Sequence, residues 1–178
     1  MLPITDSVSH TTERLTVDLG STAREFIARY EEAVPPVPAA QVSALYAKRA
    51  PWSEMLELIE SSAPFGFLIY NKNDVGPVMR LAGNTSDAVA YLMGNHTIAE
   101  RMYRLDPRAM LHAPLRTLIW ESPEGAGYFT VDRPSSQFSS YDNQAISDVG
   151  LELDHKLAML LEHLGVEVPE SLRGAPAE

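Results

Sequence analysis

The chain has 178 residues, of which 45% are hydrophobic, and it contains no cysteine. This length predicts one domain with a sizeable core. The lack of cysteine excludes disulfides, thiolate nucleophiles and cysteine-ligated zinc or iron-sulfur centres. The formal net charge of −10, from 24 acidic and 14 basic residues, argues against a nucleic-acid partner, because phosphate recognition needs clustered lysine and arginine.

The two ends of the chain show no clear structural pattern. We expect residues 1–12 to form a loose arm, residues 13–166 to form a single domain, and residues 167–178 to form a frayed tail. The N-terminal residues lack the basic start and apolar core of a signal peptide. No apolar run approaches the roughly 20 residues that a membrane span needs. We therefore expect a cytoplasmic protein with no membrane partner.

The first half of the chain mixes strand and helix patterns. Side chains alternate over residues 13–19, which predicts a half-buried strand, and a helix is expected over 21–34 with Ser21 as its N-cap. Prolines at 35, 36 and 38 stop this helix. Two short helices divided at Pro51 are expected between residues 39 and 62, followed by a strand over 65–73.

The second half contains the strongest patterns. Residues 85–95 fit a helix or a strand equally well, because apolar residues there satisfy both periods. A helix is expected over 96–105, and residues 114–122 and 125–134 predict a hairpin with a turn that contains proline and glycine. A long final helix over 143–164 buries one apolar stripe, formed by Ile146, Val149, Leu153, Leu157, Leu160 and Leu164.

Residues 65–134 resemble the domain of unknown function 302 family, which has no assigned activity. Three motifs carry the resemblance: YLMGN at 91–95, APLRTLIWE at 113–121 and YFTVDRP at 128–134. The resemblance favours a strand at 88–94. It implies an α+β fold with a curved antiparallel sheet against helices, in the order β-α-β(4)-α, similar to TATA-binding-protein-like domains. Two departures from the family are a helical insertion at 35–63, which suggests a lid, and His96 where the family usually has proline.

His96 and Glu100 are four residues apart, so they share one face of the expected helix. This spacing suits two metal ligands or a base with its orienting carboxylate, and it is equally found in ordinary surface pairs. If a metal is present, His112 is the natural third ligand, and imidazole with carboxylate suits zinc or iron. The sequence does not identify a cofactor.

Arg116 and Glu121 lie in or beside the strand at 114–122. In one orientation they face solvent and pair across the hairpin. In the other they project over a cavity, where Arg116 would bind a carboxylate or phosphate and Glu121 would have a raised pKa suited to proton transfer.

The first hypothesis is therefore a small-molecule binding protein or cofactor-independent enzyme with a pocket between sheet and helices. His112, Glu121 and His96 are the candidate catalytic residues, and the candidate ligand contacts are Arg116, Asn95, Tyr91, Tyr128 and Trp120. The expected apolar wall consists of Phe67, Ile69, Met79, Met93, Met102 and Trp120. No phosphate loop, dinucleotide fingerprint or nucleophile elbow is present. The alternative hypothesis is a non-catalytic interaction module that forms a homodimer.

Overall fold

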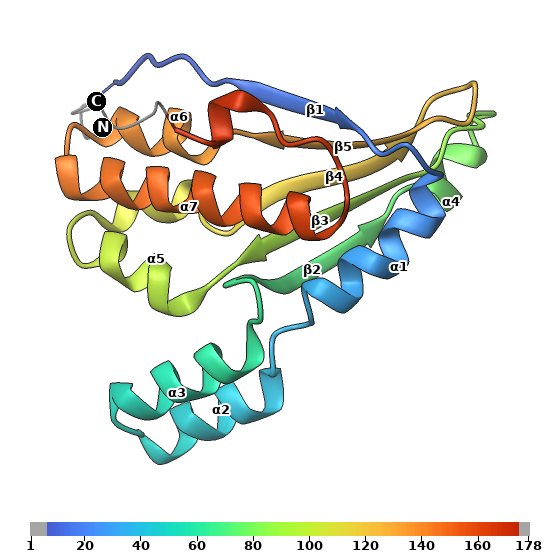
Figure 1. The fold of residues 1–178 in the computed structure, drawn as a ribbon. Helices are drawn as coiled ribbons and strands as arrows, with labels where there is room; N and C mark the ends of the chain where they lie inside the picture. Colours follow the sequence, from blue (N-terminus) through green and yellow to red (C-terminus); the bar gives the residue numbers. More distant parts are fainter. Residues whose placement is uncertain (1–6, 175–178) are drawn as a thin grey trace, which may run out of the picture.

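The computed structural model describes residues 7–174 and contains one five-stranded sheet (Figure 1). The strands are β1 (Arg14–Asp18), β2 (Leu68–Asp74), β3 (Ala88–Gly94), β4 (Leu115–Glu121) and β5 (Gly127–Asp132). Their order across the sheet is β1-β5-β4-β3-β2, and every neighbouring pair is antiparallel. The predicted α+β class with a curved antiparallel sheet is confirmed. The likeness to TATA-binding-protein-like domains stays a prediction.

Helices cover one face of this sheet (Figure 1). The α-helices are α1 (Ala23–Ala33), α2 (Ala39–Lys48), α3 (Trp52–Ser62), α4 (Gly76–Arg80), α5 (His96–Tyr103), α6 (Pro134–Phe138) and α7 (Gln144–His163). Short 3₁₀ helices are η1 (Pro107–Leu111), η2 (Ser139–Tyr141) and η3 (Glu170–Leu172). No helix in the described part of the chain is both long and apolar enough to cross a membrane.

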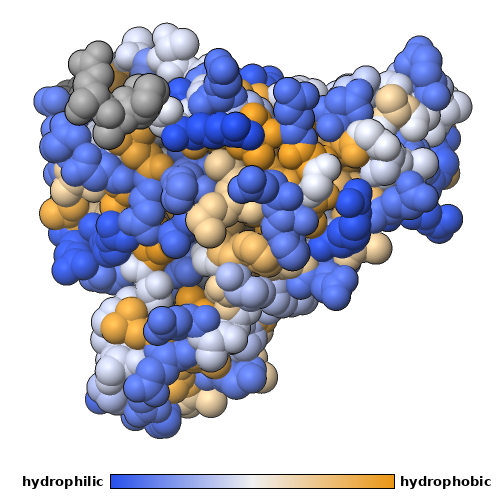
Figure 2. Space-filling model, viewed as in Figure 1, coloured by the Kyte–Doolittle hydropathy of each residue, from blue (hydrophilic) through white to orange (hydrophobic). Residues whose placement is uncertain are grey.

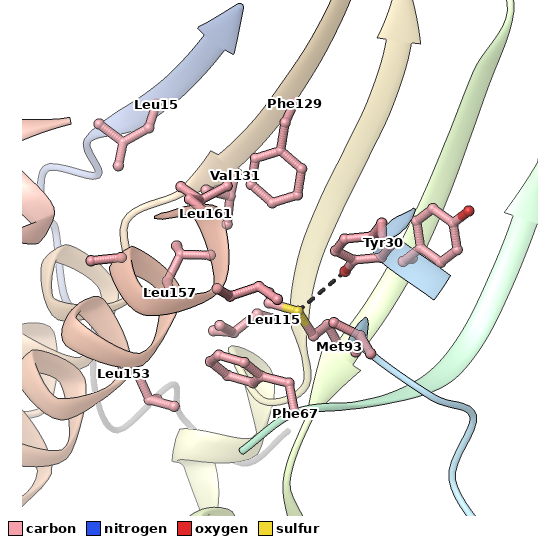
Figure 3. Packing of buried hydrophobic residues seen from close by; sticks show 14 of the residues in the cluster. Leu15, Tyr30, Phe67, Met93, Leu115, Phe129, Val131, Leu153, Leu157 and Leu161 are labelled. Carbon is pink, nitrogen blue, oxygen red and sulfur yellow. Dashed lines mark hydrogen bonds between the residues drawn. The ribbon is translucent and has the colours of Figure 1, made fainter. Parts of the chain in front are cut away.

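The strand register explains the core. Val17, Phe129, Ile119 and Val89 face one another across four strands, so one face of the sheet carries a continuous apolar row. Helices α1, α5 and α7 pack on this face. The side chains of Phe67, just before β2, of Leu115 on β4 and of Leu153 on α7 point into the same core (Figure 3). The predicted apolar stripe of α7 is buried as expected.

The strand interpretation of residues 88–94 is confirmed, since residues 89–94 pair with β2 and residues 88–93 pair with β4. Ser21 as the N-cap of the first helix is wrong. Thr22 takes that place because its hydroxyl accepts from the Glu25 amide and the Glu25 carboxylate accepts from the Thr22 amide, which forms a capping box.

The part of the C-terminal segment that packs on the domain extends further than the sequence predicted. Val168 and Leu172 are buried against the main core, so a frayed tail starting at residue 167 is wrong as far as Leu172. Burial of these two apolar side chains stabilises the packed segment, although the polar composition around them suggested fraying. Of the predicted loose arm at 1–12, residues 1–6 lie outside the described residues. The last four residues of the tail, 175–178, also lie outside them.

Helices α2 and α3 form a hairpin that projects from the body of the molecule (Figures 1 and 2). The hairpin has its own small core, in which Val42, Met55 and Ile59 pack against Leu68 of β2. Its surface carries both apolar and polar side chains. Residues 39–62 are thus helical as predicted, and their role as a lid stays a prediction.

Candidate functional site

A cavity of about 230 Å³ lies where the ends of β2, β3 and β4 meet α5 and η1. Among the described residues, no charged side chain lines it. Its lining is Phe67, Tyr70, Gly94, Asn95, His96, Ile98, Ala99, Met102, Met110, Ala113, Pro114, Leu115 and Leu153. For comparison, an apolar cavity of about 150 Å³ is large enough to hold benzene. The site therefore has room for an aromatic ring with a few further atoms.

The junction between β3 and α5 shapes one wall of this cavity. The Asn95 side-chain oxygen caps α5 by accepting from the amides of Thr97 and Ile98, at 2.8 and 3.3 Å. Its amide nitrogen donates to the Gly66 carbonyl at 3.0 Å. At Gly94, a methyl group would come within 3.1 Å of the Pro114 side chain, so glycine allows the two segments to approach. The capped helix start fixes His96 at the cavity.

Tyr70 reaches the cavity through an irregularity in β2. The pairing with β3 shifts between Ile69 and Asn71, which leaves Tyr70 as the extra residue of a β-bulge. A bulge bends its strand and redirects side chains. The Tyr70 hydroxyl thereby lies 2.7 Å from Nδ1 of His96, and the two ring centroids are 4.8 Å apart.

The direction of the Tyr70–His96 hydrogen bond follows from the chemistry of its two groups. Burial lowers the pKa of His96 and raises the pKa of Tyr70, so both groups are neutral at neutral pH. A phenol is a stronger proton donor than the N–H of a neutral imidazole, and the unprotonated imidazole nitrogen is a stronger acceptor than a phenol oxygen. We therefore assign the Tyr70 hydroxyl as the donor and Nδ1 of His96 as the acceptor.

With Nδ1 accepting, the proton of the neutral imidazole is on Nε2. No group within residues 7–174 hydrogen-bonds Nε2, and no buried side-chain nitrogen or oxygen there lacks a partner. Nε2 is therefore accessible to water or a ligand. The arrangement presents one fixed N–H donor beside an apolar cavity, a combination suited to a ligand with an apolar frame and one hydrogen-bond acceptor.

Of the predicted catalytic residues, the structure places only His96 at this cavity. His112 lines a separate hollow with Arg116 and Asp132, on the other side of Ala113 and Pro114, which border both spaces. Burial lowers the pKa of His112, and nearby His10 lowers it further, while Asp132 acts in the opposite direction.

Glu121 is at the far end of β4 from the cavity, roughly 20 Å away at the usual rise per residue. It borders a polar hollow with Arg24 and Lys72. Arg116 is exposed on the face of the sheet that the helices leave open, in the solvent-facing orientation. The structure therefore does not bring Arg116 or Glu121 to His96.

The conditional metal triad of His96, Glu100 and His112 does not form. Among the described residues, no group of three histidine or carboxylate side chains is close enough to hold a metal ion. Glu100 pairs instead with Arg104, one turn along α5, at 3.2 Å. Glu100 thus forms an ordinary surface ion pair, which is the alternative interpretation of its spacing from His96.

The remaining predicted contacts separate into three places. Asn95 lines the cavity, although its amide serves the helix cap. Tyr91 faces α1, where its hydroxyl donates to Glu31 at 2.6 Å. Trp120 and Tyr128 stack on the open face of the sheet, with ring centroids 4.7 Å apart.

The predicted apolar wall is partly correct. Phe67 and Met102 line the cavity, whereas Ile69 and Met93 are buried elsewhere in the core. Met79 is 46% exposed on α4 and does not line the cavity. Sequence reasoning missed Tyr70, because strand alternation alone assigns it no special direction. Knowledge of the bulge would have been the only signal.

The comparisons with known proteins concern family and fold. The family model described as domain of unknown function DUF302 matches residues 50–164, so α3 lies inside the match and α2 precedes it. No curated protein matches the chain. A crystal structure of an uncharacterized conserved DUF302 protein from Bacillus stearothermophilus has a similar fold, with 16% identity and a TM-score of 0.61. The similarity covers 85% of this chain and 97% of that one. The chain belongs to the DUF302 family.

Proposed function

We propose that this protein binds a small uncharged molecule in the cavity beside α5, with an apolar frame and one oxygen atom that accepts from Nε2 of His96. The observation that carries the proposal is the Tyr70–His96 hydrogen bond at the edge of an otherwise apolar, uncharged lining. A charged ligand would lose its hydration without gaining a counter-ion there.

The proposal concerns binding and not the predicted proton-transfer chemistry. Glu121, the other residue predicted for proton transfer besides the histidines, lies at the opposite end of β4 from His96. The homodimeric interaction module and the cytoplasmic location stay predictions from the sequence.

Two probes of nearly the same shape test the proposal: acetophenone, which has a carbonyl oxygen, and ethylbenzene, which has none. Their affinities are measured by NMR titration of protein with labelled methionine methyl groups, since Met102 and Met110 line the cavity. One hydrogen bond worth about 1 kcal/mol corresponds to roughly a fivefold change in affinity. We therefore expect the preference for acetophenone over ethylbenzene to fall about fivefold in His96→Phe.

His155→Phe is the matched control, because His155 is exposed on α7 and does not line the cavity. It should leave both affinities unchanged. Benzoate, the charged analogue, should bind much more weakly than acetophenone. An unchanged probe preference in His96→Phe, or tight binding of benzoate, would count against the proposed anchor.

A further inference from the structure

Strand β1 is a free edge of the sheet. It pairs with β5 only, and Figure 1 shows it at the upper margin with no described element beyond it. The other edge is different. At β2, the amide of Ile69 donates to Pro35 and the amide of Val37 donates to Ile69, both at 2.9 Å, and the bulge interrupts the strand. Only β1 therefore offers an uninterrupted row of backbone groups.

The alternation of the ladder shows which backbone groups point outward. The carbonyl of Glu13 accepts from β5 at 2.7 Å, and the amide of Leu19 donates to β5 at 3.0 Å. Along a strand of an antiparallel ladder, each residue that hydrogen-bonds the partner strand is followed by one whose amide and carbonyl point away from it. Counting from Glu13, every second residue up to Leu19 bonds β5, and the residues in between point outward. Arg14, Thr16 and Asp18 therefore direct their amides and carbonyls outward, and no residue of the described chain hydrogen-bonds them.

The side chains of this edge are complementary to themselves. In the sequence RLTVD, opposite charges stand at equal distances on either side of Thr16. All three polar residues are exposed. Antiparallel pairing centred on Thr16 places Arg14 opposite Asp18 of a second copy, twice. Parallel pairing would instead place arginine beside arginine and aspartate beside aspartate.

We infer that β1 pairs in antiparallel fashion with β1 of a second copy of this chain, with the two-fold axis at Thr16. Each facing pair at residues 14, 16 and 18 exchanges two backbone hydrogen bonds, so the unpaired edge is satisfied. The two sheets become one, and the helices of both copies lie on the same side. Because the contact is the same patch on both chains, it closes as a dimer and does not propagate.

Charge reversal tests the register of this contact. In Asp18→Arg, arginines face each other at both symmetric positions, and in Arg14→Asp aspartates do. Because each substitution acts twice, we expect the dimer of either variant to weaken by about tenfold or more in sedimentation velocity. Glu124→Arg, in the exposed turn before β5, is the control with the same change in net charge as Asp18→Arg.

Mixing the two variants in equal amounts is the decisive step. In the mixed pair, each arginine of the Asp18→Arg chain faces an aspartate of the Arg14→Asp chain, so a heterodimer should form with near wild-type affinity. Within the chain, Asp18 also accepts from the Gly20 amide at 2.8 Å and Arg14 pairs with Asp132, so each substitution removes one of these contacts. Thermal unfolding of each variant therefore checks that the monomers are still folded.

Three results would overturn the inference. The first is wild-type protein that stays monomeric at every concentration, and the second is dimerisation of both variants with the affinity of wild type. In the third, both variants are folded monomers and their mixture stays monomeric, in which case Arg14 and Asp18 do not face each other. None of these outcomes depends on the ligand proposed for the cavity.

Discussion

Replacing Tyr70 with phenylalanine would remove one oxygen atom from the cavity and leave the shape of its wall nearly unchanged. In the wild-type protein the tyrosine hydroxyl donates to Nδ1 of His96 across 2.7 Å, which keeps the imidazole proton on Nε2. Without this donor, we expect His96 to lose its preference for the Nε2–H form. The fixed donor on which the proposed ligand contact depends would be lost with it.

The size of the effect follows from the single hydrogen bond involved. A net hydrogen bond contributes about 1 kcal/mol, which corresponds to roughly a fivefold change in the ratio of the two tautomers. Because His96 is half-buried, water can replace the lost partner in part. We therefore expect the free energy of unfolding to fall by only about 1 kcal/mol.

Long-range ¹H–¹⁵N correlation spectra of histidine-labelled protein report the tautomer directly. The His96 signals are assigned by their absence in His96→Phe, and exposed His155 serves as an internal reference. Wild type should show the Nε2–H form, and Tyr70→Phe should show a mixture. A proton on Nδ1 in the wild type, or an unchanged tautomer in the variant, would show that Tyr70 does not hold the imidazole in the Nε2–H form.

Three further predictions concern the fold and the cavity. Burial lowers the pKa of His96 in the folded protein below the unfolded value of about 6.5, so between these two pKa values the unfolded chain binds more protons than the folded chain. The free energy of unfolding should therefore decrease as the pH falls through this range. The change in the free energy of unfolding with pH should be smaller in His96→Phe. Asp154, which is 2% exposed, accepts from Arg133 at 2.7 Å, so Asp154→Ala should destabilise the protein by about 3 kcal/mol in urea unfolding, whereas Asp148→Ala on the exposed side of α7 should cost little. Ala99→Leu should fill part of the cavity and weaken acetophenone binding at least tenfold in the methyl titration, with a folded spectrum as its control.

The elements that could be predicted were those with a long apolar period. The stripe from Ile146 to Leu164 and the alternation around β1 each need only local geometry to define a buried face. Residues 88–94 were ambiguous by period, and the family resemblance decided correctly for a strand. The C-terminal segment was misjudged because the burial of Leu172 depends on contacts with a core that is distant in sequence.

The candidate site was harder to predict, because it depends on how separate strand ends meet. The position of His96 follows from the Gly94–Asn95 junction, which the sequence suggests through a strand end and a helix cap. Tyr70 depends on a bulge that no local pattern encodes. Grouping His112 with His96 failed because Ala113 and Pro114 separate the two spaces that these residues line.

The most direct measurement is a set of intermolecular NOEs between bound acetophenone and the protein. We predict NOEs from the probe to the methyl groups of both Met102 and Met110, which line the cavity from α5 and η1. A perturbed His96 Nε2–H resonance should accompany them. NOEs only to Trp120 on the open face of the sheet, or none with saturating probe, would contradict a binding site in this cavity.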